Sequence, residues 1–332
     1  MAKKQQKTAE TDYLFASARV RAAEARLIGA DKLESAISSK DKGEIEALAG
    51  SLCEGKGDGA LGAYLTSVYD FISEISPSSD LAAVLRYPYD CNNIKSAIKC
   101  HFRGIASDGM MCDSGTVAPA EITRMVEKRD FSSLPENMAR GAEEAFTLYA
   151  RSLNPQIIDM VLDKACYADM LDGARRSGDD FTEALVKLKI DLTNFMMTLR
   201  CLRMSDAAKL EGDILASSLI EGGSIPAKAL LDAYFKDEAT LSSLLSGGEL
   251  MSLSLLLSKG KEASISEIEK ECDDIYMRKV RSAKFLPFGA PLLISYGVAA
   301  EYTVKNLRII LAGKRQGLRG DEIRKRVRLS YV

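Results

Sequence analysis

The stretch Tyr89-Asp90-Cys91-Asn92-Asn93-Ile94-Lys95 recurs in altered form twice more along this 332-residue chain, at residues 190–196 and 302–308. In each copy an asparagine (Asn93, Asn194 or Asn306) stands four residues after an apolar side chain and directly before another. The asparagines are 101 and 112 residues apart (194 − 93 and 306 − 194). Because self-similarity at a fixed period is typical of repeat proteins, we predict one architecture built from three related units.

A second parallel supports the same division of the chain. Gly115-Thr116-Val117-Ala118-Pro119 resembles Gly223-Ser224-Ile225-Pro226, and both stretches predict a glycine turn with proline near a helix start. We therefore expect a first helical repeat over residues 1–108, a second over 109–212 and a third over 213–332.

The composition favours a helical protein with a sizeable core. Apolar residues make up 46% of the chain and charged residues 28%, which argues against disorder. Alternating runs rich in β-branched and aromatic residues are almost absent, whereas good helix formers dominate. We predict an all-α fold, with helices over residues 12–29, 80–104 and 291–313 and a short basic helix from Asp321.

The recurring asparagines have two interpretations. An asparagine inside a helix can hydrogen-bond to a neighbouring helix or turn, and doing so once per repeat would fix the same packing register three times. Alternatively, three stripes of asparagine, apolar and basic side chains could face a shared partner. We favour the structural role for Asn93, Asn194 and Asn306.

The C-terminal segment carries a concentrated positive charge. Residues 305–332 contain nine Lys/Arg against Asp321 and Glu322, a net +7, so the rest of the chain carries −9 of the total −2. This asymmetry predicts a basic face that meets an acidic partner, although stabilisation of the last helix explains part of it. The candidate partner-binding residues are Lys314, Arg315, Arg319, Arg324, Lys325, Arg326 and Arg328.

No stretch of the sequence predicts catalysis, a cofactor or a metal site. Residues 50–57 come within one residue of a phosphate-binding loop, but Gly57 replaces the Ser or Thr that would hold magnesium, and a flexible loop over residues 50–62 fits better. Cys100 and His101 are adjacent, so on a helix they do not face each other. The seven cysteines form no Cys-x-x-Cys pair, and acidic pairs such as Asp179-Asp180 lack the alternating ligands of a calcium loop.

The sequence also predicts where the chain resides. The basic start leads into Gln and Glu, with no signal peptide, so we expect reduced thiols in a cytosol. The longest apolar stretch, Ala290 to Ala300, is shorter than the ~20 residues of a membrane helix. Any work at a membrane would require docking onto an embedded partner.

Three segments together resemble the C subunit of bacterial and archaeal V-type (A-type) ATPases, which corresponds to the d subunit of eukaryotic vacuolar ATPases. These segments are residues 13–27 (beginning Tyr-Leu-Phe-Ala-Ser-Ala-Arg), residues 89–95, and residues 288–314 with Lys305-Asn306-Leu307-Arg308. The resemblance spans residues 11–328, although the middle third matches mainly by length and helical pattern. The second copy departs from the pattern, with Ile190 in place of tyrosine and Met196 in place of Lys95 or Arg308.

The resemblance implies three similar helical bundles arranged as a funnel around a pseudo-threefold axis. It further implies a non-catalytic rotor subunit between the central axle and the membrane ring of proteolipids, peripheral to the cytoplasmic face, without a cofactor and monomeric when isolated. The chain would transmit torque for ion transport linked to ATP hydrolysis or synthesis. The ion, proton or sodium, stays open because its carboxylate belongs to the ring.

Other function classes remain as alternatives. A helical-repeat scaffold could recruit other cytosolic proteins, and a basic module could bind RNA, although the basic segment offers only Tyr331 for stacking on bases. An unrecognised thiol enzyme would lose an activity on alkylation. Retention by a detergent-solubilised proteolipid ring would separate the rotor-subunit interpretation from the scaffold and the RNA-binding module.

Overall fold

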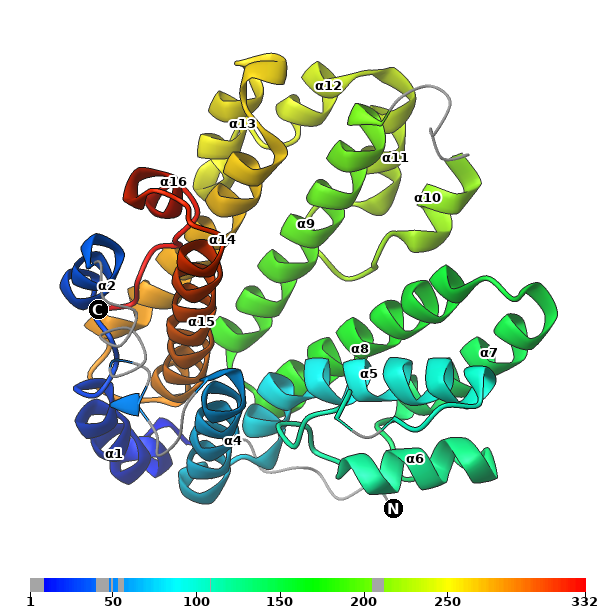
Figure 1. Cartoon of the computed structure of the whole chain (residues 1–332), viewed down its shortest axis with the longest axis horizontal. Coiled ribbons are helices and arrows are strands. Elements are labelled where there is room, and N and C mark those ends of the chain that lie inside the picture. Colours follow the sequence, from blue (N-terminus) through cyan, green and yellow to red (C-terminus); the bar gives the residue numbers. More distant parts are fainter. Residues whose placement is uncertain (1–8, 40–47, 49, 53–56, 108, 205–211) are drawn as a thin grey trace. The chain divides into compact units, whose positions relative to one another are not determined.

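We describe a computed structural model of the chain for residues 9–39, 48, 50–52, 57–107, 109–204 and 212–332 (Figure 1). Every regular element in these ranges is an α-helix or a short 3-10 helix, so the predicted all-α class is confirmed. The chain divides into two compact units, one formed by residues up to Ser78 together with Glu238–Val332 and the other by Ser79–Asp237. The predicted division at residues 108 and 212 follows the recurring motif and is a separate proposal.

The first unit is built around one long helix. Helix α15 contacts α1, α2, α4, α14 and α16 (Figure 1). Every residue from Ala290 to Ala300 is buried, which explains the long apolar stretch in the sequence as a helix surrounded by protein. The helices of this unit are α1 (Leu14–Glu24), α2 (Ala30–Ser38), α4 (Gly57–Ile75), α12 (Glu238–Ser243), α13 (Met251–Leu257), α14 (Ile265–Ser282), α15 (Ala290–Arg315) and α16 (Gly320–Arg324).

The second unit has α8 at its centre. Helix α8 contacts α5, α7, α9 and α10, while α6 packs on α5 and α11 packs on α9. Gly141 of α7 lies so close to α8 that an added Cβ would stand 2.7 Å from the Cβ of Ala165, so the two helices touch almost backbone to backbone. The helices are α5 (Ser79–Arg103), α6 (Pro119–Lys128), α7 (Glu136–Ser152), α8 (Pro155–Ser177), α9 (Asp180–Arg203), α10 (Gly212–Ser218) and α11 (Ala227–Lys236).

Two predicted elements near the start of the chain differ from the structure. The helix predicted over residues 12–29 ends at Glu24, because the chain turns to bury Leu27 and Ile28. The loop predicted over 50–62 is wrong from Gly57 onward: α4 begins there, since burying Leu61 and the following apolar face outweighs the low helix propensity of its glycines. Residues 53–56 lie outside the described ranges.

The short basic helix predicted from Asp321 is present as α16 (Gly320–Arg324), but it ends before the basic residues at 325, 326 and 328. Helix α16 ends at Arg324, so Arg326 lies in the turn that follows it and Arg328 lies beyond that turn. The last residues then return to the core, where Tyr331 is only 2% exposed. None of the helices within the described ranges has the length and apolarity that a membrane crossing requires.

Candidate functional site

The asparagine of the first motif bonds to both the backbone carbonyl and the backbone N–H of one loop residue. Asn93 lies on α5, and its Nδ2 donates to the carbonyl of Cys112 at 2.8 Å while the Cys112 N–H donates to Asn93 Oδ1 at 3.0 Å. Asp90, one turn earlier on the same helix, accepts from the N–H groups of Thr116 and Val117, each at 3.0 Å. We call each asparagine, its two-bond partner residue and the carboxylate that binds the same loop an asparagine clamp.

The second motif repeats this geometry on α9. Asn194 Nδ2 donates to the Ile220 carbonyl at 2.7 Å, and the Ile220 N–H donates to Asn194 Oδ1 at 2.9 Å. Asp191 accepts from the N–H groups of Ser224 and Ile225 at 3.0 and 2.9 Å. The two motifs therefore bind their loops with the same pair of side chains, an aspartate and an asparagine three residues apart.

The two glycine turns are matched to their carboxylates. Each glycine stands three residues after the residue that the asparagine holds. A Cβ added at Gly115 would stand 2.2 Å from Asp90 Oδ1, and one added at Gly223 would stand 2.3 Å from Asp191 Oδ1. Only glycine therefore lets the turn approach the carboxylate closely enough for two N–H groups to bind it. Sequence reasoning found both glycine turns but missed the aspartates, although the shared Asp-x-x-Asn spacing was an available signal.

The third motif keeps the amide and replaces the carboxylate. Asn306 on α15 exchanges two bonds with Arg328, from Nδ2 to the carbonyl at 3.0 Å and from the Arg328 N–H to Oδ1 at 2.8 Å. Thr303 stands where the other copies have aspartate. The next N–H, that of Leu329, is instead bound by Asp274 of α14 at 2.6 Å. The third clamp thus holds the C-terminal segment with groups from two helices.

Burial governs the electrostatics of the carboxylates. Asp90 is fully buried and Asp191 is 3% exposed. Burial raises the pKa of each carboxyl above its usual value, and the bonds donated by the turn oppose that rise. Both groups are used in holding backbone, which favours a structural role over proton transfer.

Three of the seven candidate basic residues bond to other helices of the chain. Lys314 Nζ donates to the carbonyls of Ile37 and Ser39 at the end of α2. Arg324 pairs with Glu34 of α2, and Arg328 pairs with Asp273 of α14 at 2.8 Å while its side chain remains only 11% exposed. These three side chains hold the C-terminal segment against its neighbours.

The other four candidates lie at the surface. The Arg319 side chain is 81% exposed and lies 3.7 Å from Glu322, within its own helix turn. Arg315, Lys325 and Arg326 are also exposed. We therefore propose Arg315, Arg319, Lys325 and Arg326 as the most accessible members of the candidate partner-binding set; Arg324 is also 41% exposed at its side chain.

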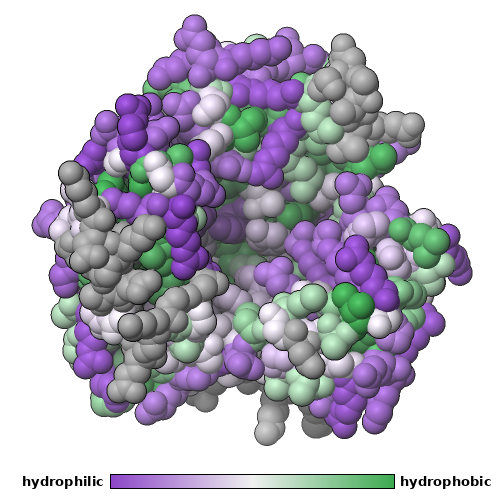
Figure 2. Space-filling model, viewed as in Figure 1, coloured by the Kyte–Doolittle hydropathy of each residue, from purple (hydrophilic) through white to green (hydrophobic). Residues whose placement is uncertain are grey.

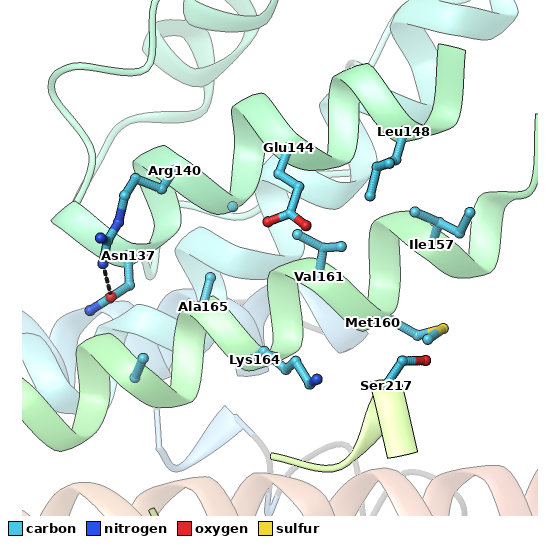
Figure 3. Close-up of a pocket in the computed structure, with 12 residues that line it drawn as sticks. Asn137, Arg140, Glu144, Leu148, Ile157, Met160, Val161, Lys164, Ala165 and Ser217 are labelled. Carbon is cyan, nitrogen blue, oxygen red and sulfur yellow. Dashed lines mark hydrogen bonds between the residues drawn. The ribbon is translucent and has the colours of Figure 1, made fainter. Parts of the chain in front are cut away.

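A groove between α7 and α8 encloses a volume of about 710 Å³. Figure 3 shows Glu144 directed toward Val161 across the groove, and Lys164 beside Ser217 of α10. Arg140 at one end donates to Asn137 at 2.6 Å. The groove combines an apolar floor with charges of both signs, and its described lining residues form no group arranged for chemistry.

The histidine and the cysteines in the described ranges are packed against other side chains or are free thiols. His101 is exposed and packs against the rings of Phe102 and Phe146. Six cysteines are free thiols in the described ranges, and Cys53 lies outside them. No group of three His, Cys, Asp or Glu side chains that could hold a metal ion occurs within the part of the chain that the structure describes.

Hydrophilic residues cover most of the face shown in Figure 2, with smaller hydrophobic areas among them.

Comparison with known proteins gives a consistent result. The family described as ATP synthase (C/AC39) subunit matches residues 16–326. The C subunit of the A-type ATP synthase of Methanocaldococcus jannaschii is 26% identical, over 94% of this chain and 85% of the relative. That of Thermococcus kodakarensis is 26% identical, over 95% and 90%. The C subunit of the V-type sodium ATPase of Enterococcus hirae is 23% identical, over 80% of each chain.

Proposed function

Because this chain belongs to the ATP synthase (C/AC39) subunit family, the C-subunit family of V/A-type ATPases, we propose that it is a non-catalytic rotor subunit of the central stalk. In this proposal it couples the axle subunits to the proteolipid ring and transmits torque for ion transport linked to ATP hydrolysis or synthesis. It would act peripherally, at the cytoplasmic face of the membrane. The match along residues 16–326, from the first helix to the basic segment, is the observation that carries the proposal.

The asparagine clamps support a role in transmitting torque. Each ties a long helix, α5, α9 or α15, to a segment 19 to 26 residues further along the chain through two bonds to one residue. Two hydrogen bonds to one residue leave little freedom for the loop to shift relative to its helix. A chain that transmits torque needs such stiffness, because slack in the connection would absorb the applied rotation.

The clamps also support the repeat organisation. The Asp-x-x-Asn pair on α5 and the one on α9 each bind a glycine turn in the same way, and the asparagine of the pair recurs on α15. On this basis we retain three repeats, over residues 1–108, 109–212 and 213–332, and propose that they form a funnel around a pseudo-threefold axis. Exact symmetry is not expected, since the third clamp takes its carboxylate from α14.

Binding of the purified chain to each partner tests the proposal. The chain is offered separately to the axle subunits and to the detergent-solubilised ring, at low and moderate salt. Retention by both is the expected result. Retention by neither, with the chain folded, would contradict the proposal and leave a helical scaffold with other cytosolic partners.

Charge reversal tests the exposed basic residues. Lys325→Glu with Arg326→Glu should weaken partner binding most strongly at low salt, because exposed charges are screened as salt increases. The matched control is Lys259→Glu with Lys261→Glu, which reverses two charges at exposed positions just after α13. If the first pair lowers the stability of the isolated chain and the control pair does not, the patch is structural and the assignment is wrong.

A further inference from the structure

The turn before α15 differs from the turns before the other two motif helices. Before α5, Ser76 and Ser78 bond to each other, and before α9 the Asp179 side chain caps the helix by accepting from the Thr182 N–H. Before α15 the chain reads Phe285-Leu286-Pro287-Phe288-Gly289, without any polar side chain. Phe285 is 90% exposed and Leu286 is 39% exposed.

Side chains of helix α1 bond to the backbone of this apolar turn. Arg21 donates to the carbonyls of Lys284 and Leu286, each at 2.8 Å, and the Gly289 N–H donates to Ser17 Oγ at 3.1 Å. Since these bonds fix the backbone on both sides of Phe285, the aromatic ring projects from a rigid support. A rigidly held aromatic side chain loses little conformational entropy on binding, which suits an interface anchor.

The face of α1 that contacts the turn ends at an exposed leucine. Leu14, Ser17 and Arg21 are spaced three and four residues apart, so they share one face of α1, and Ser17 and Arg21 contact the turn. Leu14 is 52% exposed and the neighbouring Phe15 is 66% exposed. We call Leu14, Phe15, Phe285 and Leu286 the apolar anchor.

Charges of both signs border the apolar anchor, since Glu10 and Asp12 are exposed just before Leu14 and arginines follow on α1. Arg19 lies over the rings of Phe15 and Phe71, at 5.7 and 5.2 Å from their centroids. Glu24, the one acidic residue of α1, pairs with Arg21 and accepts from Tyr331. The surface therefore complements a partner that is apolar and places a negative group opposite Arg19.

We propose that the apolar anchor is the surface by which this chain docks onto the membrane-embedded proteolipid ring. The assignment rests on the proposed function. The end of a membrane-spanning protein lies at the membrane interface, where aromatic and apolar side chains are accommodated and negative charge attracts arginine. An axle that is surrounded by water offers less of this environment, so the anchor fits the ring better than the axle.

Substitution of the anchor tests the assignment. Phe285→Ser with Leu286→Ser should lower retention by the detergent-solubilised ring at least tenfold and leave retention by the axle subunits unchanged. The control is Leu255→Ser on α13, which removes a 60% exposed leucine outside the anchor. Arg19→Glu, which leaves the turn intact, should lower ring retention in the same direction. A thermal melt of each variant shows whether the fold is kept.

The outcomes separate this assignment from the proposed function. If the unsubstituted chain binds ring and axle, and the anchor variants bind the ring equally well or lose only the axle, the anchor assignment is wrong while the proposed function stands. If the unsubstituted chain, though folded, binds neither partner, the proposed function itself fails. Binding to vesicles of phosphatidylcholine and phosphatidylglycerol without the ring, lost in Phe285→Ser with Leu286→Ser, would assign the anchor to lipid and overturn the ring assignment.

Discussion

The asparagine clamps on α9 and α15 hold backbone in the same way but differ in their surroundings. On α9 both bonds to Ile220 are buried, and the accompanying carboxylate, Asp191, comes from the same helix. On α15 the bonds to Arg328 are only partly buried, and the carboxylate comes from α14. The repeated amide therefore fixes one loop per motif, whereas the carboxylate half can be supplied by another helix where the chain ends.

The largest expected effect is at the buried clamp. Asn194→Ala removes both bonds and leaves the N–H and carbonyl of Ile220 buried without these partners, which should destabilise the chain by about 2–4 kcal/mol. Asn306→Ala should cost about 1–2 kcal/mol, since water can reach the Arg328 backbone. Urea denaturation monitored by circular dichroism measures both. Equal losses in the two variants would show that burial does not distinguish the clamps.

The close approach of the glycine turn gives the next effect. Gly223→Ala should destabilise by about 1–3 kcal/mol, because the new methyl group would displace Asp191 from its two bonds. The control is Gly62→Ala on α4, where nothing lies within 4 Å of the added Cβ and the helix should become more stable by roughly 0.5–1 kcal/mol. Destabilisation by both substitutions would argue against a specific contact at Gly223.

Two aspartates of α14, Asp273 and Asp274, bind the segment held by the third clamp. Substitution of one of them should therefore affect the third clamp alone. Asp273 pairs with Lys305 at 2.6 Å and Arg328 at 2.8 Å, and accepts from the Tyr302 hydroxyl at 3.0 Å. Asp273→Asn should destabilise by about 1–2 kcal/mol, since Arg328 is nearly buried and loses its counter-charge. Hydrogen exchange should then quicken at the Arg328 and Leu329 amides and remain unchanged at Ile220. Faster exchange at Ile220 would contradict independent clamps.

Alkaline titration gives the smallest expected difference. Burial raises the pKa of Tyr167, which bonds to Thr193 beside the α9 clamp, to about 12, and it also raises the pKa of Tyr302 beside the α15 clamp. A raised tyrosine pKa means that its contribution to stability is present below the ordinary value near 10 and is lost as pH rises through the folded-state value. Between pH 10 and 12 the Tyr167→Phe variant should therefore lose about 1–2 kcal/mol less stability than the unsubstituted chain. Unfolding of both proteins across that range measures the difference, and identical pH profiles would contradict it.

Much of the fold followed from local patterns in the sequence. The helices predicted from residues 80 and 291 correspond to α5 and α15, because their apolar faces extend over many turns. The predicted end of the helix over 12–29 was wrong, and so was the loop predicted over 50–62 from Gly57 onward, since tertiary burial of Ile28 and Leu61 decided them. The recurring asparagines were visible in the sequence, but their partners lie 19 to 26 residues away in segments whose path no local pattern specifies.

The basic segment shows the same limit. The charges of Lys314, Arg324 and Arg328 were evident in the sequence, and their partners on α2 and α14 were not. Those partners come from elements up to 290 residues away in the chain, so only the folded unit brings them together. Composition alone could not separate these three side chains, which bond to α2 or α14, from the other four.

A bridging assay tests the proposed coupling most directly. The detergent-solubilised ring is immobilised, and the axle subunits are added with and without the purified chain. We predict that the axle is retained only when the chain is present, because the chain binds both partners at once. Equal retention of the axle without the chain, or failure of the ring-bound chain to retain it, would contradict the claim that this protein couples the axle to the ring.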